Sequence, residues 1–396
     1  MFVFICATFD LPDPQGSGEQ FCAAPNIKWH FDIRFCVFVL SHRGWRAMSD
    51  TPTPITGDIQ VNTYTSNEQR YPSIAALDGG GFVVTWSSFN QDGGGWGVYG
   101  QRHDALGNKV GGEFRVNSAT FDWQTYASVA ALDGGGFVVT WTGYAQDGSG
   151  AGIYGQRYNA NGSAAGSEFR VNTFTLNDQA NSSVAALDGG GFVVTWFSYG
   201  QDGSTGGIYA QRYDASGGAS GPEFRVNSFT SGYQELPSVA ALAGGGFVIV
   251  WQSDGQDGSG FGIYGQRYNA GGVAIGSEFR VNSFTNNSQA LASVAALLDG
   301  GFVVTWQSFG QEAGNWGIYG QRYDASGVKV GTEFHVNSHT ASDQLRPTVV
   351  GLNDGGFVIT WSSQGQDGSG FGKPALDKAE IGKANCNALK HLANAL

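Results

Sequence analysis

The chain repeats itself at an interval of 55 residues over most of its length of 396 residues. A Trp recurs at this interval, and so does an Asn that follows a Val. The positions are Trp86, Trp141, Trp196, Trp251, Trp306 and Trp361, and Asn62, Asn117, Asn172, Asn227, Asn282 and Asn337. A fixed period of this length indicates a tandem-repeat fold, in which each unit is one supersecondary structure packed on its neighbours.

Each repeat predicts four short strands joined by Gly-rich turns. In one copy they fall at residues 238–242, 247–251, 262–268 and 278–282, which are rich in β-branched and aromatic residues. The second strand is apolar on both faces and must be covered on both. Alanine pairs in the first strand suit an innermost position, where neighbouring units crowd together. We therefore expect an all-β fold, a β-propeller of about six four-stranded blades with the last incomplete; another repeat-built β array is the alternative.

The two ends of the chain differ from the repeats. All four Cys lie outside them, at Cys6, Cys22, Cys36 and Cys386. Residues 1–47 lack the basic start of a classical signal peptide, and no apolar run is long enough to span a bilayer. We expect residues 1–47 to be a non-native or disordered extension before Met48, residues 48–372 to form the propeller, and residues 373–396 to be a divergent tail that is disordered or a short helix.

The lone last-type strand at residues 59–62 leaves closure of the ring open. This strand could complete the sixth blade as a clasp. Alternatively, the array was cut from a longer parent, which the change of composition at Lys373 favours.

Composition limits the function classes. The net charge is −12 and the isoelectric point is near 4.8, so a nucleic-acid partner is not expected, because phosphate binding needs a basic surface. An acidic surface suits divalent cations or neutral ligands such as sugars. No nucleophile elbow, phosphate-binding loop or His-Glu-x-x-His motif occurs. No repeat stands out by a unique set of acids, so the sequence predicts no enzyme and no catalytic residue.

Two loops of each repeat are expected to open on the same face of the propeller and to form a ligand face. The loop between the second and third strands carries Gln-Asp-Gly in five of six copies, with Gln311-Glu312 as the exception. The candidate Ca²⁺ ligands there are Asp92, Asp147, Asp202, Asp257 and Asp367. The candidate ligand-face residues are Gln91, Gln146, Gln201, Gln256, Gln366, Tyr71, Trp123 and Tyr233. Carboxylate and amide oxygens suit Ca²⁺, and aromatic rings stack on sugars.

Structural explanations compete with these functional ones. Asp-Gly and Gly-Ser-Gly are ordinary turn sequences, and turn formation by itself accounts for the Gln-Asp-Gly motif. The repeated Trp is expected in the blade core. The Arg of each Gln-Arg pair is expected to pair with a local acid such as Glu168 or Glu278.

The phrase at residues 238–268, from Ser-Val-Ala-Ala-Leu to Ile-Tyr-Gly-Gln-Arg-Tyr, resembles a repeat of large secreted bacterial proteins of the haemolysin-type calcium-binding or type I-secreted adhesin-like kind. The resemblance covers about residues 59–372 and implies export, without a classical signal peptide, to the cell surface or the extracellular space. The calcium-binding nonapeptide of that family does not occur here. We expect a non-catalytic extracellular binding or adhesion module, which binds polysaccharide or cell-surface glycans, with Ca²⁺ as the candidate cofactor. A glycan-active propeller enzyme related to sialidases or glycosidases, and a spacer without a ligand, are the alternatives.

Overall fold

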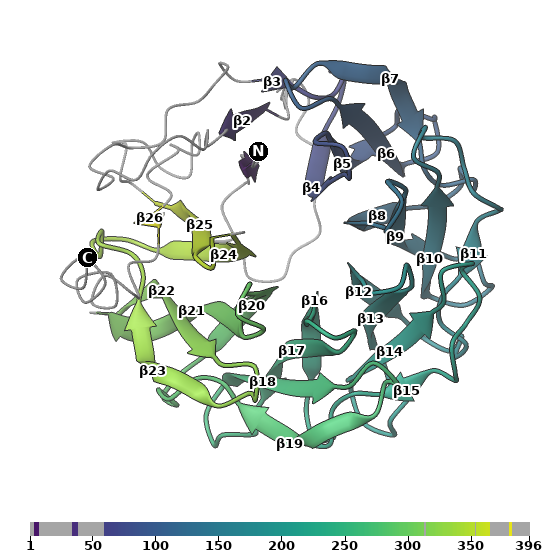
Figure 1. The fold of residues 1–396 in the computed structure, drawn as a ribbon. Coiled ribbons are helices and arrows are strands. Elements are labelled where there is room, and N and C mark those ends of the chain that lie inside the picture. Colours follow the sequence, from purple (N-terminus) through teal and green to yellow (C-terminus); the bar gives the residue numbers. More distant parts are fainter. Residues whose placement is uncertain are drawn as a thin grey trace, which may run out of the picture.

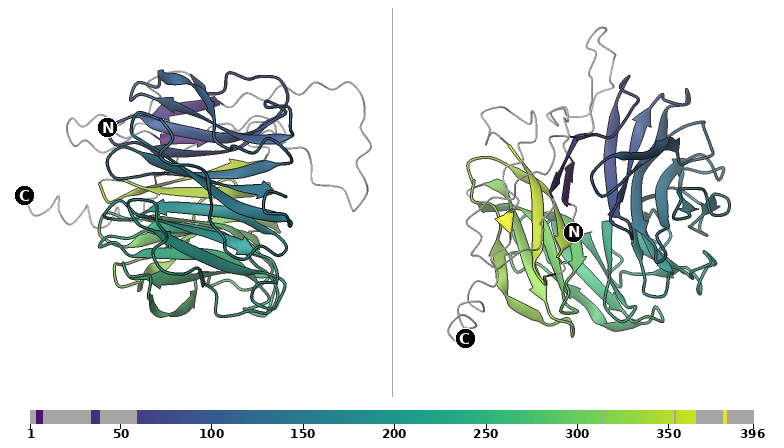
Figure 2. Two further views of the ribbon diagram at one scale, coloured as in Figure 1. Left: turned by 90° about the vertical axis from the view of Figure 1, so that its right-hand side faces the viewer. Right: turned by 45° about the horizontal axis from the view of Figure 1, so that its top comes forward.

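The computed structural model of the chain describes residues 4–7, 34–38, 59–312, 314–352, 354–364 and 380–381. These residues form antiparallel sheets arranged around a common axis (Figure 1). Seen from the side, the strands run along the axis of the ring (Figure 2). The expected β-propeller is therefore confirmed.

Five blades have four strands each, in sequence order from the axis outward. The first blade contains β4 (Gln69–Ala76), β5 (Phe82–Phe89), β6 (Trp96–His103) and β7 (Lys109–Arg115). The second contains β8 (Gln124–Ala131), β9 (Phe137–Tyr144), β10 (Ala151–Tyr158) and β11 (Phe169–Arg170). The third contains β12 (Gln179–Ala186), β13 (Phe192–Ser198), β14 (Gly207–Tyr213) and β15 (Phe224–Arg225). The fourth contains β16 (Gln234–Ala241), β17 (Phe247–Asp254), β18 (Phe261–Tyr268) and β19 (Ala274–Arg280). The fifth contains β20 (Gln289–Ala296), β21 (Phe302–Glu312), β22 (Asn315–Tyr323) and β23 (Lys329–His335).

Within the described residues the sixth blade has three strands, one fewer than the other blades. It pairs β24 (Gln344–Gly351) with β25 (Phe357–Ser363), and β25 with the short β26 (Glu380–Ile381). A further sheet joins β1 (Phe4–Ala7), β2 (Arg34–Phe38) and β3 (Ile59–Gln60). In Figure 1, β2 and β3 lie between the two ends of the arc of blades. The described strands pair β3 with β2, and closure of the ring by a clasp stays a prediction. Most of residues 1–47 and 373–396 lie outside the described residues, so the expected division of the chain stays a prediction.

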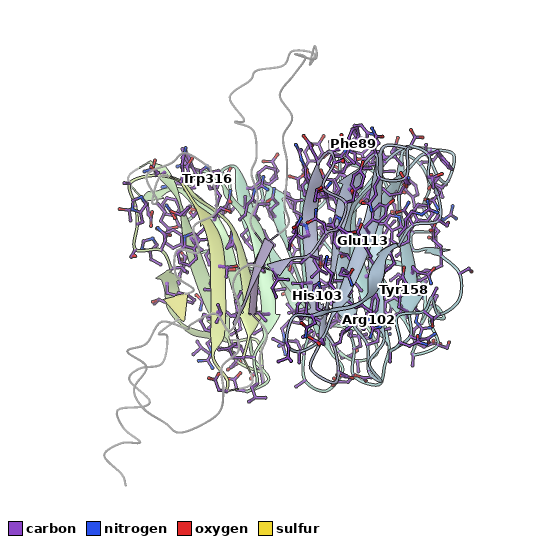
Figure 3. All side chains as sticks on the ribbon, turned by 90° about the horizontal axis from the view of Figure 1, so that it is seen from above. Phe89, Arg102, His103, Glu113, Tyr158 and Trp316 are labelled. Atoms are coloured by element: carbon purple, nitrogen blue, oxygen red, sulfur yellow. The ribbon has the colours of Figure 1, made fainter. Side chains whose placement is uncertain are left out.

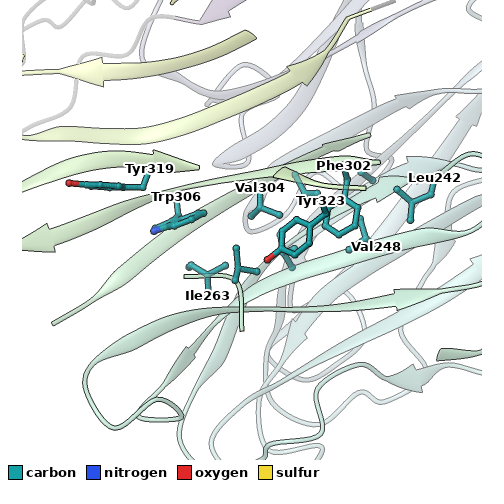
Figure 4. Packing of buried hydrophobic residues seen from close by; sticks show 12 residues of the cluster. Leu242, Val248, Ile263, Phe302, Val304, Trp306, Tyr319 and Tyr323 are labelled. Atoms are coloured by element: carbon teal, nitrogen blue, oxygen red, sulfur yellow. The ribbon is translucent and has the colours of Figure 1, made fainter. Parts of the chain in front are cut away.

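The cores lie between blades, which explains why the second strand of each repeat is apolar on both faces. Phe302, Val304 and Trp306 of β21 pack with Leu242, Val248 and Ile263 of the preceding blade (Figure 4). Burying apolar surface of this kind contributes about 25 cal/mol per Å². The repeated Trp lies in this core, as predicted, and is fully buried in the five complete blades: Trp86, Trp141, Trp196, Trp251 and Trp306.

A repeated carboxylate also fastens each blade to the one before it. In the fourth blade, Glu278 Oε2 accepts hydrogen bonds from the backbone N–H and the hydroxyl of Ser228, at 2.6 and 2.9 Å. Ser228 follows the last strand of the third blade, 50 residues earlier. Equivalent bonds are accepted by Glu113, Glu168, Glu223 and Glu333.

In four of the five Gln-Arg pairs, the Arg fastens its blade to the one after it. Arg212 donates to the backbone oxygens of Gly271 and Ala270, at 2.6 and 2.7 Å, in the turn between β18 and β19. Arg102, Arg157 and Arg267 bind the next blade in the same way. The expectation that these Arg side chains pair with acids such as Glu168 or Glu278 is wrong for these four, because those carboxylates are already occupied by the preceding blade. Arg322 alone among the five pairs with an acid, Asp299, at 2.5 Å.

The part of the chain that the structure describes contains no helix long and apolar enough to cross a membrane.

Candidate functional site

The loops between second and third strands lie at one end of the propeller, here called the loop face. Phe89, which ends β5, and Trp316, near the start of β22, lie at this end, whereas Arg102 and His103 lie toward the opposite end (Figure 3). The loops between blades reach the same face. The N–H of Ala151, which follows the loop between β9 and β10, donates to Oδ1 of Asp178 at 2.9 Å, and Asp178 lies in the segment between the second and third blades. The predicted common face is therefore present.

The Gln residues of the Gln-Asp-Gly loops hold the inter-blade carboxylates in place. Gln256 Nε2 donates to Glu278 Oε1 at 2.5 Å, and Gln201 donates to Glu223 at 2.6 Å. Gln91 and Gln146 bind Glu113 and Glu168 in the same way. Each of these four predicted ligand-face residues thus has a structural role, which is to bind a Glu of its own blade. The sequence motif did not predict this contact. Gln366 and Asp367 lie outside the described residues.

The Asp residues of the same loops form turns. Asp202 Oδ1 accepts from the Ser204 N–H at 3.0 Å, and Asp92, Asp147 and Asp257 accept from the residue two positions on in the same manner. In the first two blades a carboxylate oxygen and the neighbouring Gln oxygen are buried without a hydrogen-bond partner. Ca²⁺ takes about six to eight oxygen ligands, so each loop supplies only part of a site. Within the described ranges no group of three or more His, Cys, Asp or Glu side chains could hold a metal ion. Calcium binding at these loops stays a prediction.

The fifth blade departs from this pattern at two positions that touch. Elsewhere the loop Asp faces an Arg of the last strand, as in Asp92 and Arg115, 4.0 Å apart. In the fifth blade both members change, to Glu312 and His335, and these two side chains form an ion-pair contact. The longer carboxylate also accepts two hydrogen bonds from Asn337 Nδ2, at 3.0 and 3.1 Å. Compared with the Asp and Arg of the other complete blades, Glu312 has a longer side chain and His335 a shorter one. Because the two changes offset one another in length, we call Glu312 and His335 a compensated pair.

The first strand of every blade begins with a bulge whose central residue has a left-handed backbone. The six residues share φ values of 52° to 57°, although none is glycine: Tyr71, Tyr126, Asn181, Leu236, Leu291 and Arg346. The register shift that defines the bulge lies at this point in each first strand, for example between Glu235 and Ser238. A left-handed conformation costs a residue with a Cβ about 1–2 kcal/mol and often marks a functional site. The residue type at these positions varies among the copies.

Two of these bulge residues come together from neighbouring blades. The rings of Tyr71 and Tyr126, in the first and second blades, lie 4.4 Å apart between centroids. Burial raises the pKa of Tyr126, the hydrogen bond and charge of Tyr71 add to the rise, and the positive charge of Arg346, in the sixth blade, opposes it. Of the predicted ligand-face residues, Tyr71 belongs to this pair.

The two other predicted aromatic residues lie in segments between blades, at the loop face. Trp123 is 53 % exposed and contacts the edge of Tyr144, with ring centroids 6.1 Å apart. Tyr233 is 38 % exposed and immediately precedes β16. Both present ring surface to solvent, as a sugar-stacking residue needs to do.

The fourth blade carries two acids that no other blade has at the same register. Glu235, beside the bulge residue Leu236, corresponds to Arg70, Thr125, Ala180, Ala290 and Leu345. Asp254, which ends β17, corresponds to Phe89, Tyr144, Tyr199, Phe309 and Gln364. Burial raises the pKa of Glu235, the hydrogen bond from Gln252 opposes the rise, and the charge of Asp254 adds to it. The expectation that no repeat has a unique set of acids is therefore wrong. Register comparison of the six copies, rather than a motif search, is the signal that finds them.

Solved structures similar to this chain are also propellers. An α-L-arabinofuranosidase of Fusarium graminearum, solved with arabinobiose, matches with a TM-score of 0.51 at 12% identity and covers 74% of this chain and 88% of its own. An α-L-arabinanase of Penicillium chrysogenum matches with a TM-score of 0.50 at 15% identity and covers 74% and 89%. The NanB sialidase of Streptococcus pneumoniae matches with a TM-score of 0.50 at 8% identity and covers 75% and 65%. At these identities the likeness establishes the fold.

No protein-family model matches the chain, and no curated protein matches it. The structural neighbours nevertheless overturn the first choice made from sequence. They are enzymes that act on glycans, and together with the unique acids of the fourth blade they favour the glycan-active alternative. The expectations of a non-catalytic binding or adhesion module, and of a chain that is not an enzyme, are corrected accordingly.

Proposed function

We propose that this chain is a glycan-active propeller enzyme whose reaction takes place at the inner strands of the loop face, with Glu235 as the proton donor. The observation that carries the proposal is the asymmetry of the fourth blade. A scaffold of near-identical blades needs no half-buried acid beside a bulge, because five other blades fold with Arg, Thr, Ala or Leu at that register.

The environment of Glu235 suits a general acid. Burial and the neighbouring carboxylate of Asp254 raise the pKa of Glu235, and a raised pKa favours the protonated form that a general acid needs. In glycoside hydrolysis, that proton goes to the bridging oxygen as the bond from this oxygen to the sugar carbon breaks. Water supplies the hydroxyl to the carbon, and the remaining proton of the water returns to a carboxylate of the site. Asp254 is the second carboxylate of the pair.

The remaining residues of the site suit a carbohydrate. Trp123 and Tyr233 offer exposed rings, and the rings of Tyr71 and Tyr126 contact one another at a tilted angle. Arg346, which is exposed, places a cation beside the tyrosines. Aromatic surface with a few polar groups is the usual equipment of a sugar site. The glycosidase and sialidase propellers that share the fold support the same substrate class.

The test is turnover on a panel that starts with α-L-arabinofuranosides, arabinan oligosaccharides and sialosides. We expect the parent chain to cleave at least one, and Glu235→Gln to lower kcat by roughly 10²–10⁴-fold without lowering the melting temperature. Asp133→Asn is the control, because this exposed acid follows β8, at the end away from the loop face, and kcat should stay within about twofold. No turnover on the panel, or parental kcat in the Glu235→Gln variant, would overturn the proposal.

A further inference from the structure

Gln252 is the hydrogen-bond neighbour of Glu235 on the adjacent strand. It lies in β17, it is 4% exposed, and it faces Glu235 directly across the pair of strands β16 and β17. Its Nε2 donates to Glu235 Oε1 at 2.8 Å. Its Oε1 accepts from the backbone N–H of Leu291, the bulge residue of the fifth blade, at 3.0 Å.

The second of these contacts also occurs in blades that lack the acid. Thr142 Oγ1 accepts from the Asn181 N–H at 3.2 Å, and Gln307 Oε1 accepts from the Arg346 N–H at 2.9 Å. Each side chain therefore satisfies the N–H of a left-handed bulge residue 39 positions later, in the next blade. The cross-strand partner of Gln307 is Ala290, which has no polar side chain. Satisfying the bulge is thus the general role, and holding a carboxyl is particular to Gln252.

The two contacts together fix which way the amide of Gln252 points. A backbone N–H can be accepted only by the amide oxygen, so the amide nitrogen must face Glu235. The N–H groups of that nitrogen can only donate, so Glu235 Oε1 must be an acceptor. A proton on Glu235 is then carried by Oε2.

We infer that Gln252 is the positioning residue of this site: it binds Oε1 of Glu235, leaves Oε2 as the oxygen that gives and receives the proton, and ties this orientation to the bulge of the fifth blade. The catalytic meaning of this inference rests on the function proposed above. The orientation itself does not depend on it.

The experiment uses substitutions that the chain already contains. Gln252→Thr copies the second blade, where Thr142 satisfies the bulge N–H, and it removes the donor to Glu235. Gln307→Thr is the matched control, since it makes the same change at a bulge without a carboxyl. The carboxyl carbon of Glu235 is titrated by carbon-13 NMR, with its signal assigned by its loss in Glu235→Gln. Melting temperatures are recorded in parallel.

We expect similar melting temperatures for the two Thr variants, whereas only Gln252→Thr shifts the Glu235 titration to higher pH, because it loses a donor that favours the ionised form. On a cleaved substrate, Gln252→Thr should lower kcat by about tenfold with KM little changed and move the pH profile in the same direction. An unchanged Glu235 titration in Gln252→Thr, or the same shift in Gln307→Thr, overturns the inference even where the parent cleaves glycans.

If the parent cleaves nothing, the proposed function fails, and the titration still decides the orientation. If Gln252→Thr does not fold while Gln307→Thr does, the titration is repeated on Gln252→Glu, which keeps an acceptor for Leu291. A shift of the Glu235 titration to lower pH in that variant would contradict the inference.

Discussion

The compensated pair in the fifth blade makes a quantitative prediction about coupling between two residues. Glu312→Asp shortens the carboxylate by one methylene, so it no longer reaches both His335 and Asn337. The carboxylate is buried, and hydrogen bonds to charged groups contribute about 1.5–3 kcal/mol, so we expect a loss of about 2 kcal/mol in the free energy of unfolding. His335→Arg alone crowds the longer acid, and we expect a loss of about 1 kcal/mol.

The double variant restores the pair found in the other four complete blades and should be close to the parent. The expected coupling energy is then about 2–3 kcal/mol, within the range of about 0.5–3 kcal/mol for residues in contact. Urea unfolding of the parent, both single variants and the double variant measures it. The reverse exchange in the fourth blade, Asp257→Glu with Arg280→His, is the matched control and should show coupling of the same sign. Additive losses, within about 0.5 kcal/mol, would refute the idea that the two residues changed to fit one another.

Three further predictions follow from other contacts. Glu278→Ala should lower the free energy of unfolding by about 2 kcal/mol in urea, since it removes two hydrogen bonds that join the third and fourth blades and one within the fourth blade. A loss no greater than that of the exposed Asp133→Ala would contradict this prediction. Arg212→Met should lower the free energy of unfolding by about 1–2 kcal/mol in urea, because it leaves two backbone carbonyls of the fourth blade without their donor. Arg322→Met should lower it less, because Arg322 binds an exposed acid in its own blade. Burial first, and then a neighbouring acid, raises the pKa to about 12 in Tyr99, Tyr154, Tyr209, Tyr264 and Tyr319. Unfolded tyrosines ionise near 10, so stability should be intact below pH 10 and fall as the pH rises toward 12, and a melting temperature constant over that range would be the contrary result.

The fold follows from the sequence because one period determines it. Six copies of the same strand pattern leave one physical choice for a strand that is apolar on both faces, which is to place a neighbour on each side. Residues such as Trp251 and the alanines of the first strand have the same role in every copy, so their burial could be predicted. Periodicity therefore predicted the blades, their order and the common loop face.

Contacts between blades were harder to predict, because their partners are about one repeat apart. Arg212 and Glu278 both belong to recurring motifs, and pairing opposite charges within a repeat was the natural interpretation. The structure shows that each binds backbone groups of a different neighbouring blade. Sequence distance alone does not say whether position 212 meets its own blade or the next one. The end of the ring was uncertain for the same reason, since the pairing of β3 with β2 depends on strands that no repeat predicts.

The candidate site consists of positions that vary among the repeats, and a search for repeats does not use these positions. A repeat is recognised by what stays constant, and the constant residues here pack the core or join the blades. Bulge residues such as Tyr126 and Leu236 vary among the copies. Their left-handed backbone could not be predicted from the residue type, because neither is the Gly or Asn that this conformation favours. Nothing in the blade contacts requires Glu235 or Asp254 either, because the other blades pack without them. Variation at fixed register, on strands that otherwise hardly change, is therefore the feature that separates the proposed site from the scaffold. By this argument, replacing Glu235 with the Ala of the fifth blade should leave the propeller as stable as the parent and remove the proposed activity.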